Sequence, residues 1–546
     1  MSLYPTSIGP IPEETVRVAQ AAFPTGNIYM RLREELGVVY DDATFAGLFP
    51  TRGQPAEAPW RLAMVTVLQF VEALSDRQAA DAVRGRIDWK YLLGLELGNP
   101  GFDHTVLSEF RTRLIGGHAE LVLLNALLGR SQELGLFRPR GRQRTDSTHV
   151  LAAVRVLNRL ERVGETLRAA LNSLAVVTPD WLRSIAPIAW YERYGSRVEN
   201  YGLPKTEAAR RELAAAIAAD GQLLLQTIDA AVEQPWLQQI PAVQVLRQVW
   251  AEQYVKEGGR LRWREVKEIP IPAEMISSPY DAEARYSSKR SVEWVGYKVH
   301  LTETCDADTP HLITNVETTP AASPDDLMLG VVHASLATMA RLPAEHLVDK
   351  GYTDSHVLVD SQREYGITIV GPVADDPSWQ AQAGSGFAKG DFIIDWDART
   401  ATCPSGKQSL SWLINPDATK PETAVVRFSR RDCSPCPVRS QCTRRQVEPR
   451  ELVLQPRVEH EALQAARRHQ QTEDFKVQYA ARAGIEGTHA QAVRRAGLRR
   501  SRYIGLAKTR LQHIATAAAL NLVRINEWCS GTPLAKTRIS RFAALQ

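Results

Sequence analysis

The sequence predicts an α/β protein in which a helical N-terminal region precedes a mixed sheet that is interrupted by insertions. Apolar residues recur at helical spacing through roughly the first 140 residues, and this pattern favours helices. From about residue 281 the hydrophobic pattern switches to period two, which is typical of strands. Strands and a helix then alternate up to about residue 373, as expected for a mixed α/β core.

Composition sets limits on the class of protein. The 546 residues have room for roughly three to four domains of about 150 residues each. An apolar fraction of 44% and a charged fraction of 23% exclude a wholly disordered or collagen-like chain. The sequence shows no secretory-signal pattern and no apolar stretch of about 20 residues, so we expect a cytoplasmic protein without membrane spans.

The N-terminal residues 1–135 predict short helices joined by short turns. One apolar-periodic run begins at Pro59, which suits a first helical turn, and ends near Ser75. Further helices are expected over residues 76–86, 89–95 and 103–114. Arginines within these helices suit a DNA-binding module, and a purely structural helix bundle is the alternative.

The rest of the chain predicts strands with helical and loop-rich segments between them. Strands are expected over residues 141–152, 294–302, 311–318, 346–349 and 367–373. Helices are expected over residues 154–174, 205–258, 325–340 and 459–528. Residues 375–455 are rich in Gly, Pro, Asp and Cys and interrupt this alternation.

Three acidic residues stand out. Asp146 lies inside a predicted strand and Asp349 at the carboxyl end of another, while Glu486 shares one predicted helical face with Tyr479 and Arg482. A lone acid after a strand is usually a turn or capping residue, and Glu486 beside Arg482 can be a simple surface ion pair. Together, however, acids from two strands and one helix can converge at the end of a sheet where α/β folds place ligands.

Three converging carboxylates suit phosphoryl transfer. Mg²⁺ prefers carboxylate and water ligands, and two such ions about 3.5–4 Å apart activate an attacking hydroxyl and stabilise a leaving oxygen. We therefore expect Asp146, Asp349 and Glu486 to be catalytic residues that bind Mg²⁺, or Mn²⁺ in its place.

These motifs resemble the bacterial insertion-sequence DDE transposases that carry a Tyr-Arg-Glu-Lys signature. Thr-Asp-Ser-Thr around Asp146 and Asp-Lys-Gly-Tyr from Asp349 look like the first two acidic motifs of that family. Tyr479, Arg482 and Glu486 have the spacing of the third motif. The resemblance covers most of the chain and implies that Tyr479 and Arg482 contact DNA.

One position departs from the signature. Its last basic residue falls at Val493, and Arg494 and Arg495 follow immediately on a slightly rotated helix face. Which of the two arginines takes over the phosphate contact is open, whereas the three carboxylates match the family pattern.

The resemblance also implies a fold and an activity. It implies an RNase H-like catalytic domain over 136–530, a helical insertion at 155–280, a Cys-containing insertion at 385–455 and a tail at 531–546. The expected activity is metal-dependent cleavage at transposon ends and strand transfer into target DNA, by a homodimer on paired terminal inverted repeats near the bacterial nucleoid. The alternatives are a catalytically silent protein that binds transposon ends and a standalone metal-dependent nuclease.

Four cysteines crowd into one segment with the spacing C-x₂₉-C-x₂-C-x₅-C. They are Cys403, Cys433, Cys436 and Cys442. The Cys-Ser-Pro-Cys part resembles half of a structural zinc site, so we expect zinc here. Because the paired Cys-x-x-Cys arrangement is incomplete, reduced thiols in a small loop domain are the alternative.

A strongly basic segment follows the third acid. Between residues 494 and 510 there are seven Lys or Arg and no Asp or Glu. The basic residues closest to Glu486 are Arg494, Arg495, Arg499 and Arg500. This composition predicts contacts with DNA phosphates, which supply affinity but not sequence choice; a solvated helix face is the alternative.

Overall fold

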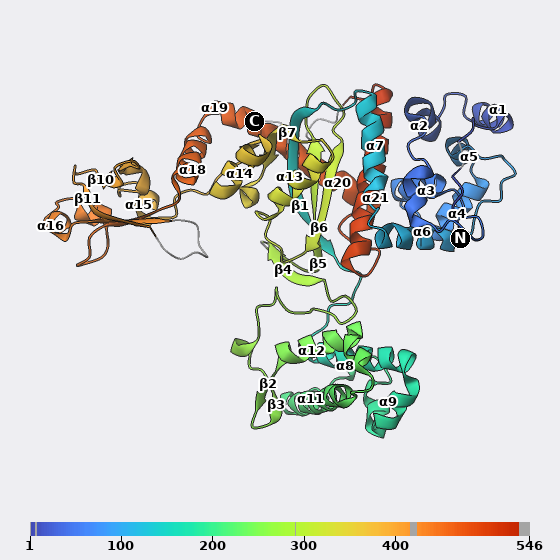
Figure 1. Ribbon diagram of the computed structural model, residues 1–546, viewed down its shortest axis with the longest axis horizontal. Coiled ribbons are helices and arrows are strands. Elements are labelled where there is room, and N and C mark those ends of the chain that lie inside the picture. Colours follow the sequence, from blue (N-terminus) through green and yellow to red (C-terminus); the bar gives the residue numbers. More distant parts are fainter. Residues whose placement is uncertain (1, 6–7, 290, 415–422, 534–546) are drawn as a thin grey trace.

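The computed structural model describes residues 2–5, 8–289, 291–414 and 423–533, and its centre is a six-stranded mixed sheet (Figure 1). The strand order is β6–β5–β1–β7–β8, and β4 pairs with the other half of β5. The strands are β1 (Arg140–Leu151), β4 (Arg285–Lys289), β5 (Val292–Thr304), β6 (Ile313–Pro320), β7 (Pro343–Val348) and β8 (Thr368–Val370). β7 runs parallel to β1 and β8, whereas β5 is antiparallel to β1, β4 and β6.

The two central strands are buried along most of their length. β1 and β5 show near-continuous burial instead of the alternation of a half-exposed strand, as expected where helices cover both faces. On one face lie α20 (Gly484–Ala496) and α21 (Leu506–Cys529), and on the other lie α13 (Met328–Thr338) and α14 (Ser355–Tyr365) (Figure 1). The predicted mixed sheet is confirmed.

The N-terminal part is helical, as predicted. Its helices are α1 (Glu13–Ala22), α2 (Ile28–Leu36), η1 (Ala43–Leu48), α3 (Pro59–Val71), α4 (Asp76–Gly85), α5 (Ile87–Leu93), α6 (Thr105–Gly116) and α7 (Val122–Glu133). Pro59 occupies the first turn of α3, and Ser75 caps α4 through a reciprocal pair of bonds with Gln78.

The N-terminal helices share one hydrophobic core with the sheet. Helix α21 lies between them in Figure 1, and a single buried cluster runs from Phe45 and Trp60 through Leu520 of α21 to Leu301 of β5. The helical region therefore ends near the predicted boundary at residue 135, but its hydrophobic core continues into the sheet.

A helical segment with its own core connects β1 to β4. Its elements are α8 (Arg159–Val177), α9 (Pro179–Ile185), α10 (Ile188–Tyr194), η2 (Asn200–Gly202), α11 (Glu207–Ala230), η3 (Pro235–Gln239), α12 (Pro241–Gln253), β2 (Tyr254–Glu257), β3 (Arg260–Trp263) and η4 (Val266–Glu268). The buried residues Leu167, Ile217 and Val249 belong to a cluster separate from that of the sheet. In Figure 1 this segment stands below the sheet.

The Cys-bearing segment forms a second outlying part. It contains α15 (Trp379–Gln382), η6 (Lys389–Asp391), β9 (Ile393–Asp395), β10 (Thr400–Thr402), β11 (Ser409–Ile414), β12 (Ala424–Phe428), α16 (Arg430–Cys433), α17 (Arg439–Cys442) and β13 (Glu451–Leu454). Strands β11, β12 and β13 form a small antiparallel sheet. Figure 1 places this segment on the side of the central sheet opposite the N-terminal helices.

The chain returns to the sheet through α18 (Arg457–His469) and α19 (Glu473–Ala480). A 3₁₀ turn, η7 (Ala481–Ala483), then leads into α20. The region predicted as helical over 459–528 is thus four helices. In the described ranges, no helix is long and apolar enough to cross a membrane. Of the predicted tail at 531–546, only residues 531–533 fall among those described.

Candidate active site and nucleic-acid interface

Asp146 and Asp349 lie on neighbouring parallel strands. The register pairs Thr145 of β1 with Val348 of β7, and the residue that follows each of them in the chain is one of the two acids. Asp349 directly follows β7 and accepts a hydrogen bond from the Gly351 N–H at 2.9 Å. The structure thus brings these two predicted residues together at the carboxyl end of β7.

Arg482 joins all three predicted carboxylates. Its Nη2 lies 2.8 Å from Asp146 Oδ2 and 3.9 Å from Asp349 Oδ2, and its Nη1 lies 3.0 Å from Glu486 Oε1. The side chain of Arg482 is only 14% exposed, whereas that of Glu486 is 69% exposed. A single guanidinium therefore compensates acids from β1, from the end of β7 and from α20.

The expectation that Tyr479, Arg482 and Glu486 lie on one continuous α-helix was wrong. Tyr479 belongs to α19, Arg482 to the 3₁₀ turn η7 and Glu486 to the first turn of α20. The Ala481 carbonyl accepts a hydrogen bond from the Gly484 N–H, as in a 3₁₀ turn, and a second one from the Arg144 side chain. Local spacing correctly predicted the Arg482–Glu486 pair but not this break.

The electrostatics of the site are those of crowded acids around one cation. Burial raises the pKa of Asp146 to about 6, with Arg482 lowering it and the nearby Asp349 raising it. Burial acts to lower the pKa of Arg482, but Asp146, Tyr479 and Asp349 together raise it above its ordinary value. The arrangement therefore stabilises positive charge at this point.

The donor set suits a hard divalent ion, because it consists of carboxylate oxygens. Across the ranges that the structure describes, no three His, Cys, Asp or Glu side chains gather closely enough to hold a metal ion. The acids instead surround the Arg482 guanidinium, each within 4.0 Å of it. These residues fit Mg²⁺ or Mn²⁺ by their chemistry, and closer convergence on an ion requires Arg482 to leave its present position.

Asp325 and Lys298 lie beside the acids and were not predicted as site residues from the sequence. Lys298 of β5 donates to Asp325 Oδ1 at 2.9 Å, and Ser147 donates to Asp325 Oδ2 at 3.2 Å. Asp325 precedes α13 and therefore reaches the site from a loop. No motif surrounds it in the sequence, so only the pairing of β5 with β1 could reveal it.

The four arginines predicted to bind DNA phosphates are exposed. Arg494 and Arg495 lie in the last turn of α20, and Arg499 and Arg500 lie in the loop that follows. Arg495 is 4.0 Å from Glu527, and Arg499 donates to the Thr148 hydroxyl at 2.9 Å. Val493, at the position of the signature Lys, packs against the hydrophobic core instead.

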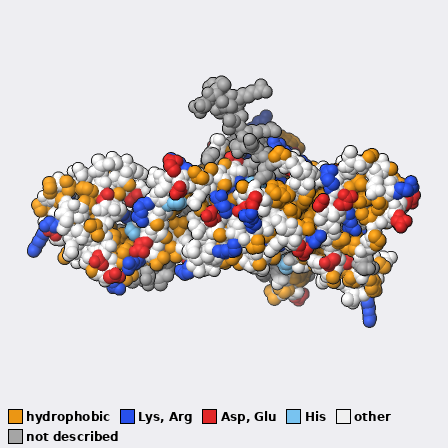
Figure 2. Space-filling view, turned by 90° about the horizontal axis from the view of Figure 1, so that it is seen from above, with side chains coloured by type: hydrophobic (Ala, Val, Ile, Leu, Met, Phe, Trp, Pro, Cys, Tyr) orange, Lys and Arg blue, Asp and Glu red, His pale blue; other side chains and the backbone are white. Residues whose placement is uncertain are grey.

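Other basic residues of this segment have structural contacts. Arg502 donates to the Leu74 carbonyl at 3.0 Å and stacks on Phe70, and the Tyr503 ring lies under the guanidinium of Arg111. Part of the basic segment thus fastens the sheet to the N-terminal helices. Basic and acidic side chains are interspersed over the face seen in Figure 2, so no single basic patch dominates it.

The arginines of the N-terminal helices are also paired internally. Arg86 bonds to Glu72 and Asp88, and Arg111 bonds to Asp76. These contacts favour the structural interpretation of Arg86 and Arg111 over a role in DNA binding.

The four clustered cysteines face one small cavity. Cys403, Cys433, Cys436 and Cys442 line a volume of about 30 Å³, and the Lys407 N–H donates to Cys403 Sγ at 3.3 Å. They are not among groups close enough to hold a metal ion in the part of the chain described. The zinc prediction has no support from this geometry, and metal analysis of the purified protein would test it.

Comparison with known families gives two matches. A family model described as a transposase DDE domain matches residues 402–526, which include the Cys-bearing segment and Glu486. A second model, described as a transposase domain (DUF772), matches residues 18–113 in the N-terminal helices. No curated protein matches the chain. The two transposase models, which match separate parts of one chain, indicate an insertion-sequence transposase of the DDE type.

Proposed function

We propose that the protein is a DNA transposase that cleaves DNA at transposon ends and transfers the freed strand into target DNA. The observation that carries this proposal is the meeting of Asp146, Asp349 and Glu486 around one guanidinium. The strand order β6–β5–β1–β7–β8, in which β5 is antiparallel to both β1 and β6 while β7 and β8 run parallel to β1, supports an RNase H-like core over residues 136–530.

Asp146, Asp349 and Glu486 would hold two Mg²⁺ or Mn²⁺ ions. When bound, these ions activate the attacking oxygen and stabilise the leaving oxygen of an in-line displacement. The burial of Asp146 keeps bulk water from one side of the site, while the exposed Glu486 leaves the other side open to a DNA strand. We assign contacts with the reacting phosphate to Arg482 and Tyr479, which lie beside the acids.

The remaining assignments concern DNA and the assembly. The exposed arginines 494, 495, 499 and 500 would contact phosphates of terminal inverted repeats or of target DNA. We assign residues 1–135 to a DNA-binding domain, and we expect a homodimer that acts on paired ends at the bacterial nucleoid. The DUF772 match to the N-terminal helices supports a transposase role for them.

The test is a cleavage assay on DNA that carries the flanking inverted repeats, with Mg²⁺. Asp146→Asn, Asp349→Asn and Glu486→Gln should each abolish strand cleavage while leaving DNA binding intact, because each keeps shape but removes a charged ligand. Double variants should be hardly worse than single ones, since the ligands act as a unit. If a variant cleaves DNA at the parent rate, the substituted residue is not part of the active site.

The same assay separates the alternatives. Cleavage without strand-transfer products would indicate a standalone nuclease. Binding to the ends with no cleavage by the parent protein would indicate a catalytically silent protein.

A further inference from the structure

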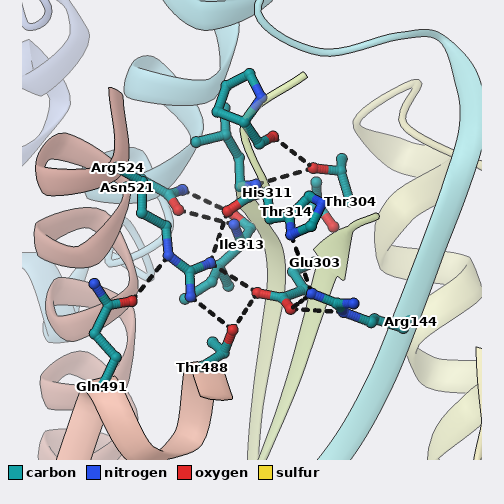
Figure 3. A network of polar contacts seen from close by, with 12 residues as sticks. Arg144, Glu303, Thr304, His311, Ile313, Thr314, Thr488, Gln491, Asn521 and Arg524 are labelled. Atoms are coloured by element: carbon teal, nitrogen blue, oxygen red, sulfur yellow. Dashed lines mark hydrogen bonds and ion pairs between the residues drawn. The ribbon is translucent and has the colours of Figure 1, made fainter. Parts of the chain in front are cut away.

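A network of buried charged side chains connects β1, β5, α20 and α21 (Figure 3). At its centre is Glu303 of β5, whose side chain is completely buried. Its Oε1 accepts a hydrogen bond from Arg144 Nε at 2.7 Å, and its Oε2 accepts one from Arg524 Nη1 at 2.7 Å. Burial acts to raise the pKa of Glu303, but Arg524 and Arg144 hold it below its ordinary value, so the carboxylate stays charged.

This network holds α20 through Thr488. The Thr488 hydroxyl donates to Glu303 Oε2 at 2.6 Å and accepts from Arg524 Nη2 at 2.6 Å. Arg524 Nε also donates a hydrogen bond to the side-chain oxygen of Gln491 on α20 at 3.0 Å. As Figure 3 shows, Thr488 of α20 and Arg524 of α21 converge on the Glu303 carboxylate, while Gln491 contacts Arg524. Thr488 lies two residues after Glu486.

On the other side the network holds β1 and the turn before α20. Arg144 lies two residues before Asp146 on the same face of β1, and it donates to the carbonyl of Ala481 next to Arg482. A Cβ on Gly484, the first residue of α20, would lie 2.1 Å from Arg144 Nη1. The glycine thus lets the guanidinium fit under the start of the helix.

The position of Glu486 depends on this anchoring. Its side chain is 69% exposed and pairs with Arg482, so the backbone of α20 decides where its carboxylate stands relative to Asp146. We propose that Glu303 and Thr488 are positioning residues that set the distance between Asp146 on β1 and Glu486 on α20. This inference rests on the proposed function, because it concerns the geometry of the same three acids.

The test uses the full-length protein and compares two buried threonines. Thr488→Val removes the hydroxyl that joins α20 to Glu303 and Arg524. Thr304→Val is the matched control, because the Thr304 hydroxyl is equally buried on β5, donates to the Pro310 carbonyl at 3.1 Å and accepts from the Leu312 N–H at 2.9 Å. Each substitution removes a buried hydroxyl that makes two hydrogen bonds, but the second leaves α20 untouched.

Mn²⁺ affinity, DNA cleavage rate and Tm are measured for each variant. Loss of contacts behind metal ligands typically costs 10- to 100-fold in metal affinity or activity, so Thr488→Val should bind Mn²⁺ about tenfold more weakly and cleave more slowly. Thr488→Ser retains the hydroxyl and should behave like the parent. Thr304→Val should lower Tm about as much as Thr488→Val but keep the parent affinity for Mn²⁺.

Two results would overturn the inference. One is parent-like Mn²⁺ binding and cleavage by Thr488→Val; the other is an equal loss of Mn²⁺ affinity in Thr304→Val, which would reflect general destabilisation. If Thr488→Val does not fold, Gln491→Met is used instead, because it removes the second contact between α20 and Arg524. This variant should weaken Mn²⁺ binding by a smaller factor than Thr488→Val. Parent-like Mn²⁺ binding by Gln491→Met would then overturn the inference. A different result bears on the proposed function. If Asp146→Asn binds Mn²⁺ as tightly as the parent protein does, the proposed function itself is wrong.

Discussion

Arg482 pairs with the three acids, and the DNA contact proposed for it would require it to leave them. Its guanidinium occupies the centre of the three acids, yet the resemblance assigns the same residue to DNA. Like charges brought together in a partly buried site need a nearby cation, and here a side chain provides it. The proposed metal binding would therefore compete with the pairing of Arg482 with the acids.

We predict that Arg482→Gln binds Mn²⁺ more tightly than the parent protein. A unit charge about 4 Å away is worth about 1–4 kcal/mol at effective dielectric constants between 80 and 20, so the affinity should rise about tenfold or more. Isothermal titration calorimetry without DNA measures it. Arg494→Gln, which removes the charge of an exposed arginine on α20, is the control and should change little. Unchanged or weaker binding by Arg482→Gln would contradict the competition.

Buried histidines make the stability depend on pH. His513 of α21 lies 2.8 Å from the Thr318 hydroxyl, and burial lowers its pKa to about 3. In the unfolded chain a histidine has a pKa of about 6.5, so the unfolded state binds the proton first as the pH falls. The contribution of neutral, buried His513 to the unfolding free energy is thus fully present above pH 6.5 and is lost progressively as the pH falls from 6.5 towards 3.

From pH 7 to pH 5 this one group should cost about 2 kcal/mol of unfolding free energy. His513→Asn should therefore show a weaker pH dependence than the parent by about that amount, whatever its stability at pH 7. Urea unfolding at the two pH values measures the difference. Identical pH dependence in the two proteins would show that His513 is not held neutral.

At the level of elements, α20 is held at its first turn by packing against β1. Ile485 is fully buried in the core, and Gly484 leaves room for the Arg144 guanidinium. The next glycine, Gly487, has nothing within 4 Å of the place where a Cβ would stand. The two glycines on one helix thus have opposite steric surroundings.

We predict opposite effects of alanine at these two glycines. Gly484→Ala forces Arg144 away from the Ala481 carbonyl and should lower the unfolding free energy by about 1–3 kcal/mol. Gly487→Ala should be neutral or stabilise by up to about 1 kcal/mol, since alanine favours the helix over glycine. Thermal unfolding of both variants tests this. Equal effects on the unfolding free energy would mean that the position of Arg144 does not require a glycine at residue 484.

At the level of the whole molecule, the N-terminal helices, the sheet and α21 form one body, and two segments with separate cores project from it (Figure 1). The exposed arginines after α20 lie on this central body, close in sequence to Glu486. Phosphate contacts made there would bring DNA to the acids without reading its sequence.

Replacing Arg499 and Arg500 together by Ala should weaken binding to all DNA sequences alike. The dependence of log K on log salt should flatten by up to about one unit for each lost phosphate contact. Fluorescence anisotropy over a salt series measures both effects. The double variant Arg183→Ala and Arg211→Ala loses the same charge from exposed sites in the helical segment and should bind like the parent. A loss confined to one DNA sequence would instead indicate base readout.

Much of the site could be predicted because its signals are local. Asp146 lies within a predicted strand and Asp349 at the end of another, and the spacing of Arg482 and Glu486 places them one helical turn apart. The supporting residues carry no such signal. Glu303 contacts Thr488 across 185 positions of the chain, and in isolation it looks like an ordinary acid in a strand.

The sequence by itself determined the mixed sheet, the helical N-terminal region and the three acidic motifs, because hydrophobic period and short spacings act within one element. Only the tertiary structure decided that Arg482 stands among the acids, that α19 and α20 are separated by a 3₁₀ turn, and that the N-terminal helices share the core of the sheet. The physical reason is that a buried charge is tolerated only where partners meet it, and here those partners come from distant elements. Arg144, Glu303 and Arg524 come from three different elements, and folding alone brings them together.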